Sequence, residues 1–265
     1  MKGLLLINPR SGRGAPNSDE LRAEAEARGI ETRLLESGDD PAELAAASRA
    51  DAVGVAGGDG SLAPVADVAL ATDRAFVCVP FGTRNHFARD LGLDRRGPVA
   101  ALDAFSGEER RIDVGRIGDR LFLNNVSLGA YAALVHRRER HRRRRRLLAR
   151  ARALILTARH GHESVLLLEG APLAAHVVLV ANNAYRLELF DIGERPSLTG
   201  GKLHLYTARG VLPTAWEKRA AERLTLDSPD GPVAAAVDGE PAALQPPLEF
   251  RIEPQALRVL LPPGR

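Results

Sequence analysis

Two glycine-bracketed loops in this chain each follow an apolar run that has the composition of a buried strand. Residues 53–56 lead into Gly57-Gly58-Asp59-Gly60-Ser61, and residues 76–80 lead into Phe81-Gly82-Thr83-Arg84-Asn85. Glycine has no Cβ, so backbone N–H groups in such loops can approach phosphate oxygens closely. Asp59 adds a carboxylate that can address a magnesium ion or a reacting hydroxyl. The two loops therefore predict a site that handles phosphate.

The first loop also has a structural interpretation, as a turn in which Asp59 caps the following helix. The second loop opens a predicted helix, whose dipole favours an anion. We interpret His86, which follows it, as a structural residue.

A third loop, Asn8-Pro9-Arg10-Ser11-Gly12-Arg13-Gly14, follows the apolar run at residues 3–7. Asn8 places a polar side chain at a strand end, and Gly12 and Gly14 permit a tight turn around an anion. No Gly-Lys-Ser/Thr follows, so this is not a Walker loop, and the Gly-x-Gly-x-x-Gly dinucleotide fingerprint is absent.

An acidic tripeptide, Asp238-Gly239-Glu240, follows an apolar run late in the chain. It is typical of an ordinary turn. In a kinase it would bring two further carboxylates towards the phosphates.

The first hundred residues alternate between strand and helix patterns. Strands are predicted at residues 3–7, 32–35, 52–56 and 76–80, and helices at 18–28 (N-cap Ser18), from Asp40-Pro41 onwards, and at 62–70. This alternation predicts a doubly wound parallel sheet with helices on both faces. Ligands of such sheets lie at the carboxyl ends of the strands, where the three loops fall.

From residue 111 the pattern changes to short strands separated by turns. Gly118-Asp119 predicts a hairpin between residues 112–116 and 121–126, and residues 131–160 read as one long basic helix. Further strands are predicted at residues 165–168, 176–181, 202–207, 233–237, 248–252 and 257–261, with one helix at 213–223. We therefore predict two domains: an α/β nucleotide domain at 1–115, and a β-sandwich-rich domain at 116–265.

Composition indicates a globular protein, with 45% hydrophobic and 27% charged residues in 265. The single cysteine, Cys78, excludes an intramolecular disulfide and fits a core position in a reducing cytosol. No apolar stretch reaches the ~18 residues that span a bilayer, and the N-terminal run is too short for a signal peptide. We expect a cytoplasmic protein without a transmembrane span.

Eleven arginines lie between Arg137 and Arg159. They suit a solvated helix face, or peripheral contact with an anionic membrane, where each contributes roughly 1 kcal/mol. No aromatic platform or nucleic-acid motif accompanies them, so we expect no nucleic-acid partner.

The motifs taken together resemble the diacylglycerol kinase catalytic-domain family, which includes soluble bacterial lipid kinases and the sphingosine and ceramide kinases. The resemblance is carried, in order, by Asn8-Pro9, Gly12, Gly57-Gly58-Asp59-Gly60, Gly82-Thr83-x-Asn85-x-Phe87-Ala88, Asn124-x-x-Ser127-x-Gly129 and Asp238-Gly239-Glu240. Gly-Gly-Asp-Gly alone is shared with NAD kinases and phosphofructokinases, so the combination carries the specificity.

The resemblance implies ATP in a cleft between the domains, with magnesium bridging its phosphates and an aspartate accepting the proton of a lipid hydroxyl. Asp238 and Asp59 are both candidates for that base and for the metal; we favour Asp238 as base and Asp59 as metal ligand. The nucleotide-binding candidates are Asn8, Pro9, Ser11, Gly12, Ser37, Gly57, Gly58, Asp59, Gly60, Ser61, Gly82, Thr83, Asn85, Gly239 and Glu240.

Three positions depart from the family pattern. Ala63-Pro64-Val65 stands where Asn-Glu-Val is common, and Ser61 replaces threonine but keeps the hydroxyl. Residues 198–202, Leu-Thr-Gly-Gly-Lys, lack the acid that bacterial members use for a structural magnesium, so we expect no second metal there.

The leading hypothesis is an ATP- and Mg²⁺-dependent lipid kinase, with diacylglycerol as the default acceptor, held at the inner membrane face by the arginine-rich helix. One alternative is a kinase of a soluble metabolite, similar to NAD kinase. The other is a non-catalytic nucleotide-binding regulator at a membrane surface, suggested by the lost polar pair and the missing acid. Assembly as a homodimer stays open.

Overall fold

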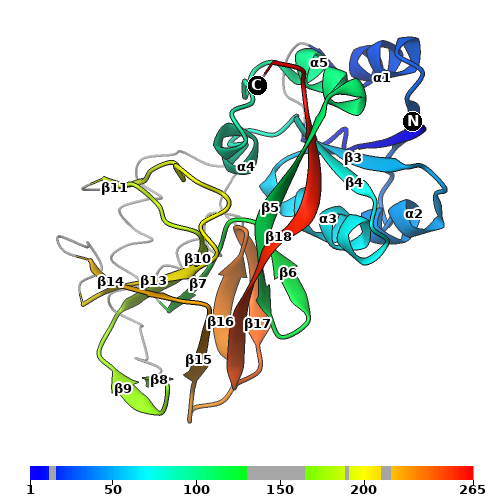
Figure 1. The fold of residues 1–265 in the computed structure, drawn as a ribbon. Helices are drawn as coiled ribbons and strands as arrows, with labels where there is room; N and C mark the ends of the chain where they lie inside the picture. Colours follow the sequence, from blue (N-terminus) through cyan, green and yellow to red (C-terminus); the bar gives the residue numbers. More distant parts are fainter. Residues whose placement is uncertain (12–15, 130–164, 189–190, 210–215, 265) are drawn as a thin grey trace, which may run out of the picture. The chain divides into compact units, whose positions relative to one another are not determined.

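Parallel strands form the sheet of the first of two units in this computed structural model (Figure 1). The structure describes residues 1–11, 16–129, 165–188, 191–209 and 216–264. The strands are β1 (Gly3–Ile7), β2 (Glu31–Leu34), β3 (Ala52–Gly57) and β4 (Ala75–Pro80), in the order β2-β1-β3-β4. Every position of β1, β3 and β4 is buried, including Cys78, as continuous apolar runs predict for strands covered on both faces.

Helices cover both faces of this sheet, which confirms the doubly wound prediction. They are α1 (Ser18–Ala27), α2 (Pro41–Ala47), α3 (Leu62–Ala71), α4 (His86–Asp90) and α5 (Pro98–Ala101), with 3₁₀ turns η1 (Asp59–Ser61) and η2 (Leu102–Ser106). In Figure 1, α2 and α3 lie together on one face, and α1 and α5 on the other.

Side chains that cap these helices fix where they begin. Asp40 accepts the Ala42 N–H at 2.8 Å, with Pro41 at the first helical position, as predicted. For α1 the predicted cap, Ser18, is wrong by one residue. Asn17 is the cap, because its side chain accepts two N–H groups and Glu20 completes a capping box with it.

The last strand joins the two units through the chain itself. β18 (Leu248–Leu261) is continuous, where we predicted two strands. Val259, in its second half, pairs in parallel with Phe76 of β4. By internal contacts the first unit comprises Met1–Val114, Pro196–Thr199 and Pro254–Arg265, and the second Gly115–Arg195 and Gly200–Glu253. The segments after residue 195 therefore alternate between units, whereas our division assigned residues 116–265 to one domain.

Antiparallel strands build the second unit. One sheet has the order β14-β13-β10-β7-β16-β17. Its strands are β14 (Glu217–Ala221), β13 (Leu203–Ala208), β10 (Val177–Asn182), β7 (Asn125–Gly129), β16 (Val233–Val237) and β17 (Glu240–Leu244). The remaining strands are β5 (Glu108–Ile117), β6 (Arg120–Phe122), β8 (Leu166–Leu168), β9 (Ala171–Leu173), β15 (Arg223–Asp227), and the short pair β11 (Leu187–Glu188) and β12 (Asp191–Ile192).

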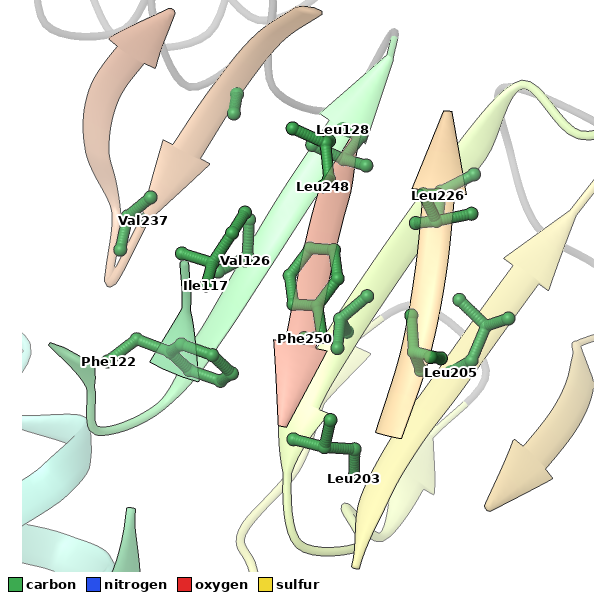
Figure 2. Close-up of a cluster of buried hydrophobic side chains, with 14 of the residues drawn as sticks. Ile117, Phe122, Val126, Leu128, Leu203, Leu205, Leu226, Val237, Leu248 and Phe250 are labelled. Carbon is green, nitrogen blue, oxygen red and sulfur yellow. The ribbon is translucent and has the colours of Figure 1, made fainter. Parts of the chain in front are cut away.

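An apolar core fills the space between these strands, as expected of a sandwich. Figure 2 shows Phe250 of β18 near the centre of this core. Phe122 of β6 packs edge-on against Phe250, with 6.4 Å between ring centroids. The predicted hairpin at Gly118-Asp119 is confirmed, since β5 pairs with β6 around it.

The helix predicted at residues 213–223 is wrong over its described part. Residues 217–221 form β14, which pairs antiparallel with β13 along its whole length. Leu203 lies opposite Ala221 at one end of the pair, and Thr207 lies opposite Glu217 at the other. Their Glu, Lys, Arg and Ala composition favours a helix, but pairing with a buried neighbour strand overrides that weak preference. The charged side chains of β14 also suit an edge strand, since they discourage pairing with other chains.

Two further predictions, the basic helix at 131–160 and the role of Gly12, fall outside the described residues. Within the described part of the chain, no helix has the length and apolar character to cross a bilayer.

Candidate active site

The loops singled out in the sequence leave the parallel sheet at a single edge. Ile7 pairs with Leu34 of β2 and Ala56 of β3, so these strands end at the same level. The chain stays bonded just beyond: the Asn8 N–H donates to Ala56 O at 2.9 Å, and the Phe81 N–H to Gly57 O at 3.2 Å. Parallel strands thus carry Asn8, Ser37, Gly58 and Gly82 to one rim, where ligands bind such sheets.

The two glycine loops pack directly on one another. A Cβ built on Gly82 would lie 2.5 Å from Gly58 Cα, closer than any real contact, whereas one on Gly58 would meet Gly82 Cα at 3.8 Å. Glycine at 82 is therefore required for loop packing, while Gly58 has room for a methyl group and an ordinary extended backbone.

Asn85 shapes the second loop from inside. Its Oδ1 accepts the Gly82 N–H at 2.9 Å, and its Nδ2 donates to Gly82 O at 2.9 Å and to Arg95 O at 3.3 Å. The residue is buried, with a left-handed backbone (φ 48°) that asparagine tolerates better than most. We predicted nucleotide binding for Asn85; in this structure its carboxamide organises the loop.

Asp59 ties the loops together. One carboxylate oxygen accepts the His86 N–H at 3.1 Å and the other accepts the Phe87 N–H at 2.9 Å. The structural interpretation placed Asp59 as a cap of the next helix. In the structure its carboxylate instead binds the first N–H groups of α4, 27 residues away from Asp59 at His86. The residue is half-exposed, so each oxygen keeps a lone pair for a further partner. Burial lowers the pKa of His86, against the opposing charge of Asp59.

The other candidate nucleotide-binding residues at this rim are of two kinds: some have side chains that hydrogen-bond within their own loop, and others are exposed. The Ser61 hydroxyl donates to Gly58 O at 2.8 Å, and Asn8 Oδ1 accepts the Arg10 N–H at 3.1 Å, so both are used within their loops. Pro9, Ser37 and Thr83 are exposed. Within the described residues, the N–H groups of Gly58, Thr83 and Arg84 donate to no protein acceptor.

The acidic tripeptide lies in the second unit as the turn between β16 and β17. Val237 pairs with Glu240, and Asp238 and Gly239 between them both have positive φ, 50° and 84°. These are the features of a two-residue type I′ hairpin turn, for which Asp-Gly is a preferred sequence. The structural interpretation of this motif is therefore met.

The Asp238 side chain nevertheless turns into the protein. Its oxygens accept the backbone N–H groups of Leu123 at 2.8 Å, Asn124 at 2.7 Å and Asn125 at 3.1 Å. Burial raises the pKa of Asp238 to about 6, while these three hydrogen bonds and the charge of Arg195 oppose the rise.

Sequence reasoning missed Arg195, which is buried beside this turn at 3% exposure. Its guanidinium donates to Leu123 O at 2.6 Å, Asn182 O at 3.0 Å and Asn124 Oδ1 at 2.8 Å. The sequence marks Asn124, through the family motif, but around Arg195 shows only an arginine before a proline.

Residues 198–202, which lack the acid expected for a structural magnesium, are bound by the side chain of Asn183. Asn183 Oδ1 accepts the Gly200 N–H at 2.8 Å, and Asn183 itself has a left-handed backbone (φ 68°). No group of three or more His, Cys, Asp and Glu side chains suited to a metal occurs in the described residues. That finding leaves room for an ion bound by one carboxylate and phosphate oxygens.

The structure thus brings together the amino-terminal candidates in one unit, and Asp238, Gly239 and Glu240 in the other. Their convergence on one nucleotide stays a prediction.

Comparison with known proteins finds similarity to diacylglycerol kinases and probable lipid kinases. Residues 2–117 match the family model described as diacylglycerol kinase catalytic domain. The chain is 38% identical over 122 residues to a diacylglycerol kinase of Mycobacterium tuberculosis (strain H37Rv), covering 43% of this chain and 40% of that one. It is 35% identical over 138 residues to a probable lipid kinase YegS-like of Pseudomonas fluorescens, covering 48% and 44%. The match therefore spans less than half the length of these relatives.

In fold, the chain is similar to the crystal structure of a diacylglycerol kinase from Bacillus anthracis str. Sterne. The TM-score is 0.72 at 17% identity, with 98% of this chain and 96% of that chain covered. At this identity the likeness shows a shared fold.

We predict that Gly82→Ala and Gly58→Ala differ sharply. The methyl group at 82 must displace the Gly58 backbone, which should cost about 1–3 kcal/mol of stability. The methyl group at 58 meets only an ordinary contact and should change stability by less than about 0.5 kcal/mol. Urea unfolding of both variants checks this, and equal effects on stability would contradict the packing described.

We also predict a specific pH dependence for Asp238. Its pKa is about 6 when folded, above the ordinary 3.8, so the protonated form favours the folded state. Its stabilising contribution is complete below pH 3.8 and is lost as the pH rises through about 6. The unfolding free energy of the wild type minus that of Asp238→Asn should therefore fall by about 2–3 kcal/mol between pH 4 and pH 8. A difference that stays flat would show that the carboxyl group is not destabilised by burial.

Proposed function

The domain formed by residues 2–117 of this chain belongs to the diacylglycerol kinase catalytic-domain family, and from that premise we propose that the protein is a lipid kinase. It transfers the γ-phosphoryl group of ATP to the hydroxyl of a lipid alcohol, with diacylglycerol as the first acceptor to test. The observation that carries the proposal is the pair of glycine loops packed at one sheet edge and joined by the Asp59 carboxylate.

Backbone N–H donors make this rim of the parallel sheet suitable for binding a triphosphate. The N–H groups of Gly58, Thr83 and Arg84 have no protein acceptor in the described part of the chain, and the glycines keep side chains out of the way. Phosphoryl transfer needs mainly positioning and neutralisation of charge, which such amides supply. The neighbouring Thr83 hydroxyl is exposed and adds a further donor.

Asp59 fits a magnesium ion in its donor chemistry. Mg²⁺ takes oxygen ligands and is commonly bound by one or two carboxylates together with substrate phosphates and water. The half-exposed carboxylate keeps a lone pair on each oxygen, while the His86 and Phe87 N–H groups hold its orientation. Bound there, the ion would neutralise charge on the phosphates.

Asp238 suits the role of proton acceptor. A pKa raised to about 6 leaves the carboxylate ionised at neutral pH and makes it a stronger base than an ordinary aspartate. Three backbone N–H groups fix its direction, and Oδ2 accepts only one of them. Glu240, exposed at the start of β17, is the further carboxylate proposed to approach the nucleotide.

The acceptor and the location belong to the same proposal. The relatives named above as diacylglycerol kinase and probable lipid kinase support a lipid alcohol. We propose that the enzyme is cytoplasmic and meets its substrate at the inner membrane face through residues 137–159, as a monomer or homodimer. Transfer of ³²P from ATP with Mg²⁺ to a panel of lipid alcohols in mixed micelles tests this. Transfer to NAD and to no lipid would favour the soluble-metabolite kinase, and nucleotide binding without any transfer would favour the regulator.

We predict that Asp59→Asn lowers kcat by about 10²–10⁴. An amide offers one oxygen where the carboxylate offers two, and it removes the negative charge that would bind the metal. The matched control is Asp51→Asn, because Asp51 also accepts a backbone N–H, from Lys2 at 2.8 Å, but precedes β3 at the opposite end of that strand. Equal activity of the two variants would contradict the role of Asp59.

A further inference from the structure

A buried guanidinium, that of Arg195, has no part in the chemistry described above. It is buried at 3% exposure, and it donates hydrogen bonds to two backbone carbonyls and one side-chain amide oxygen. Removing a guanidinium from water is costly unless such contacts compensate. These hydrogen bonds therefore hold the guanidinium at a fixed place in the second unit.

Arg195 and the carboxylate of Asp238 bind the same short segment of backbone. Leu123 accepts from Arg195 through its carbonyl at 2.6 Å and donates its N–H to Asp238 at 2.8 Å. Asn124 likewise accepts from Arg195 through Oδ1 at 2.8 Å and donates its N–H to Asp238 at 2.7 Å. Arginine and aspartate thus bind the Leu123–Asn124 peptide unit at opposite ends, through the Leu123 carbonyl and the Asn124 N–H, so each hydrogen bond polarises the other.

Further contacts fix the arginine itself. The guanidinium lies over the Tyr185 ring, 5.6 Å from its centroid. The Tyr185 hydroxyl accepts from Asn125 Nδ2 at 3.1 Å, and the Tyr185 N–H donates to the Tyr206 hydroxyl at 2.8 Å. Asn182 adds a second donor to Leu123 O, at 3.0 Å from its Nδ2. The arginine is therefore held between the end of β10, the Tyr185 ring and the residues that precede β7.

No other charged side chain among the described residues acts on Asp238 in this way. Glu194, next to Arg195 in the chain, pairs with Arg186 at the surface, 3.1 Å apart. Glu240 is exposed on the strand that follows the turn.

We propose that Arg195 is a positioning residue for phosphoryl transfer: it clamps the Leu123–Asn125 backbone so that its N–H groups hold the Asp238 carboxylate in one orientation. The kinetic part of this inference rests on the proposed function, whereas the structural part does not. Losing the clamp loosens the carboxylate without touching the glycine loops that would bind the nucleotide. Misplacement by about 1 Å costs on the order of 10²-fold in rate.

The test compares Arg195→Ala and Arg195→Lys with Arg186→Ala, a matched control at an exposed arginine of the same unit. Arg195→Ala should lower kcat about 100-fold with the KM for ATP changed less than twofold. Guanidinium at sub-denaturing concentration should restore part of that kcat by refilling the space, and Arg195→Lys should keep part of it through its charge. Arg186→Ala should leave kcat and KM unchanged.

Amide hydrogen exchange gives a readout that needs no activity. Exchange at Leu123, Asn124 and Asn125 should accelerate at least tenfold in Arg195→Ala, and remain unchanged in the first unit. Unchanged exchange, or a kcat per folded molecule equal to wild type, would overturn the proposal. If Arg195→Ala does not fold, the same two measurements on Arg195→Lys decide the question. If the wild-type protein transfers phosphate to no acceptor, only the proposed function is contradicted. The exchange measurement would still test whether Arg195 clamps the backbone.

Discussion

The hydrogen bond from backbone N–H to carboxylate is the interaction on which the candidate residues of each unit depend. Asp59 accepts two N–H groups from the loop that opens α4, and Asp238 accepts three from the segment before β7. In each case one carboxyl side chain binds a stretch of backbone far away in sequence and so organises the local fold. Charge-assisted bonds of this kind are about twice as strong as neutral ones. The same two aspartates therefore hold the local structure and are the candidates for the chemistry. For this reason the activity of an Asp59 or Asp238 variant has to be compared with its stability.

Much of the first unit could be predicted because its signals are local. Buried parallel strands read as continuous apolar runs, and Asp40-Pro41 marks a helix start through its own chemistry. Loop positions such as Gly58 and Gly82 follow from where those strands end. What the sequence could not show is that Gly82 is needed to pack against Gly58, since that demand arises only when the two loops meet.

The failures have non-local causes. Residues 217–221 have a helical composition, and only the neighbouring strand β13 makes them a strand. Arg195 gives no signal in sequence, because its partners Leu123 and Asn182 lie 72 and 13 residues away and are bound through their carbonyls. A carbonyl acceptor is present at every residue, so no pattern of residue types can reveal such a contact. Among the described residues to which Arg195 donates hydrogen bonds, Asn124 is the one that a motif indicates.

The difference in environment between the two aspartates favours a division of labour. Asp59 is half-exposed at the rim of a sheet, where a hydrated ion can arrive, shed some of its water and bind phosphate oxygens at the same time. Asp238 is buried, with a pKa raised to about 6, an environment that disfavours a hydrated ion and favours the gain of a proton. The three backbone hydrogen bonds limit that rise in pKa, and the charge of Arg195 opposes it in the same direction. A base of this kind needs both kinds of influence, because burial makes the carboxylate a stronger base, while the groups that favour its charged form let it stay ionised.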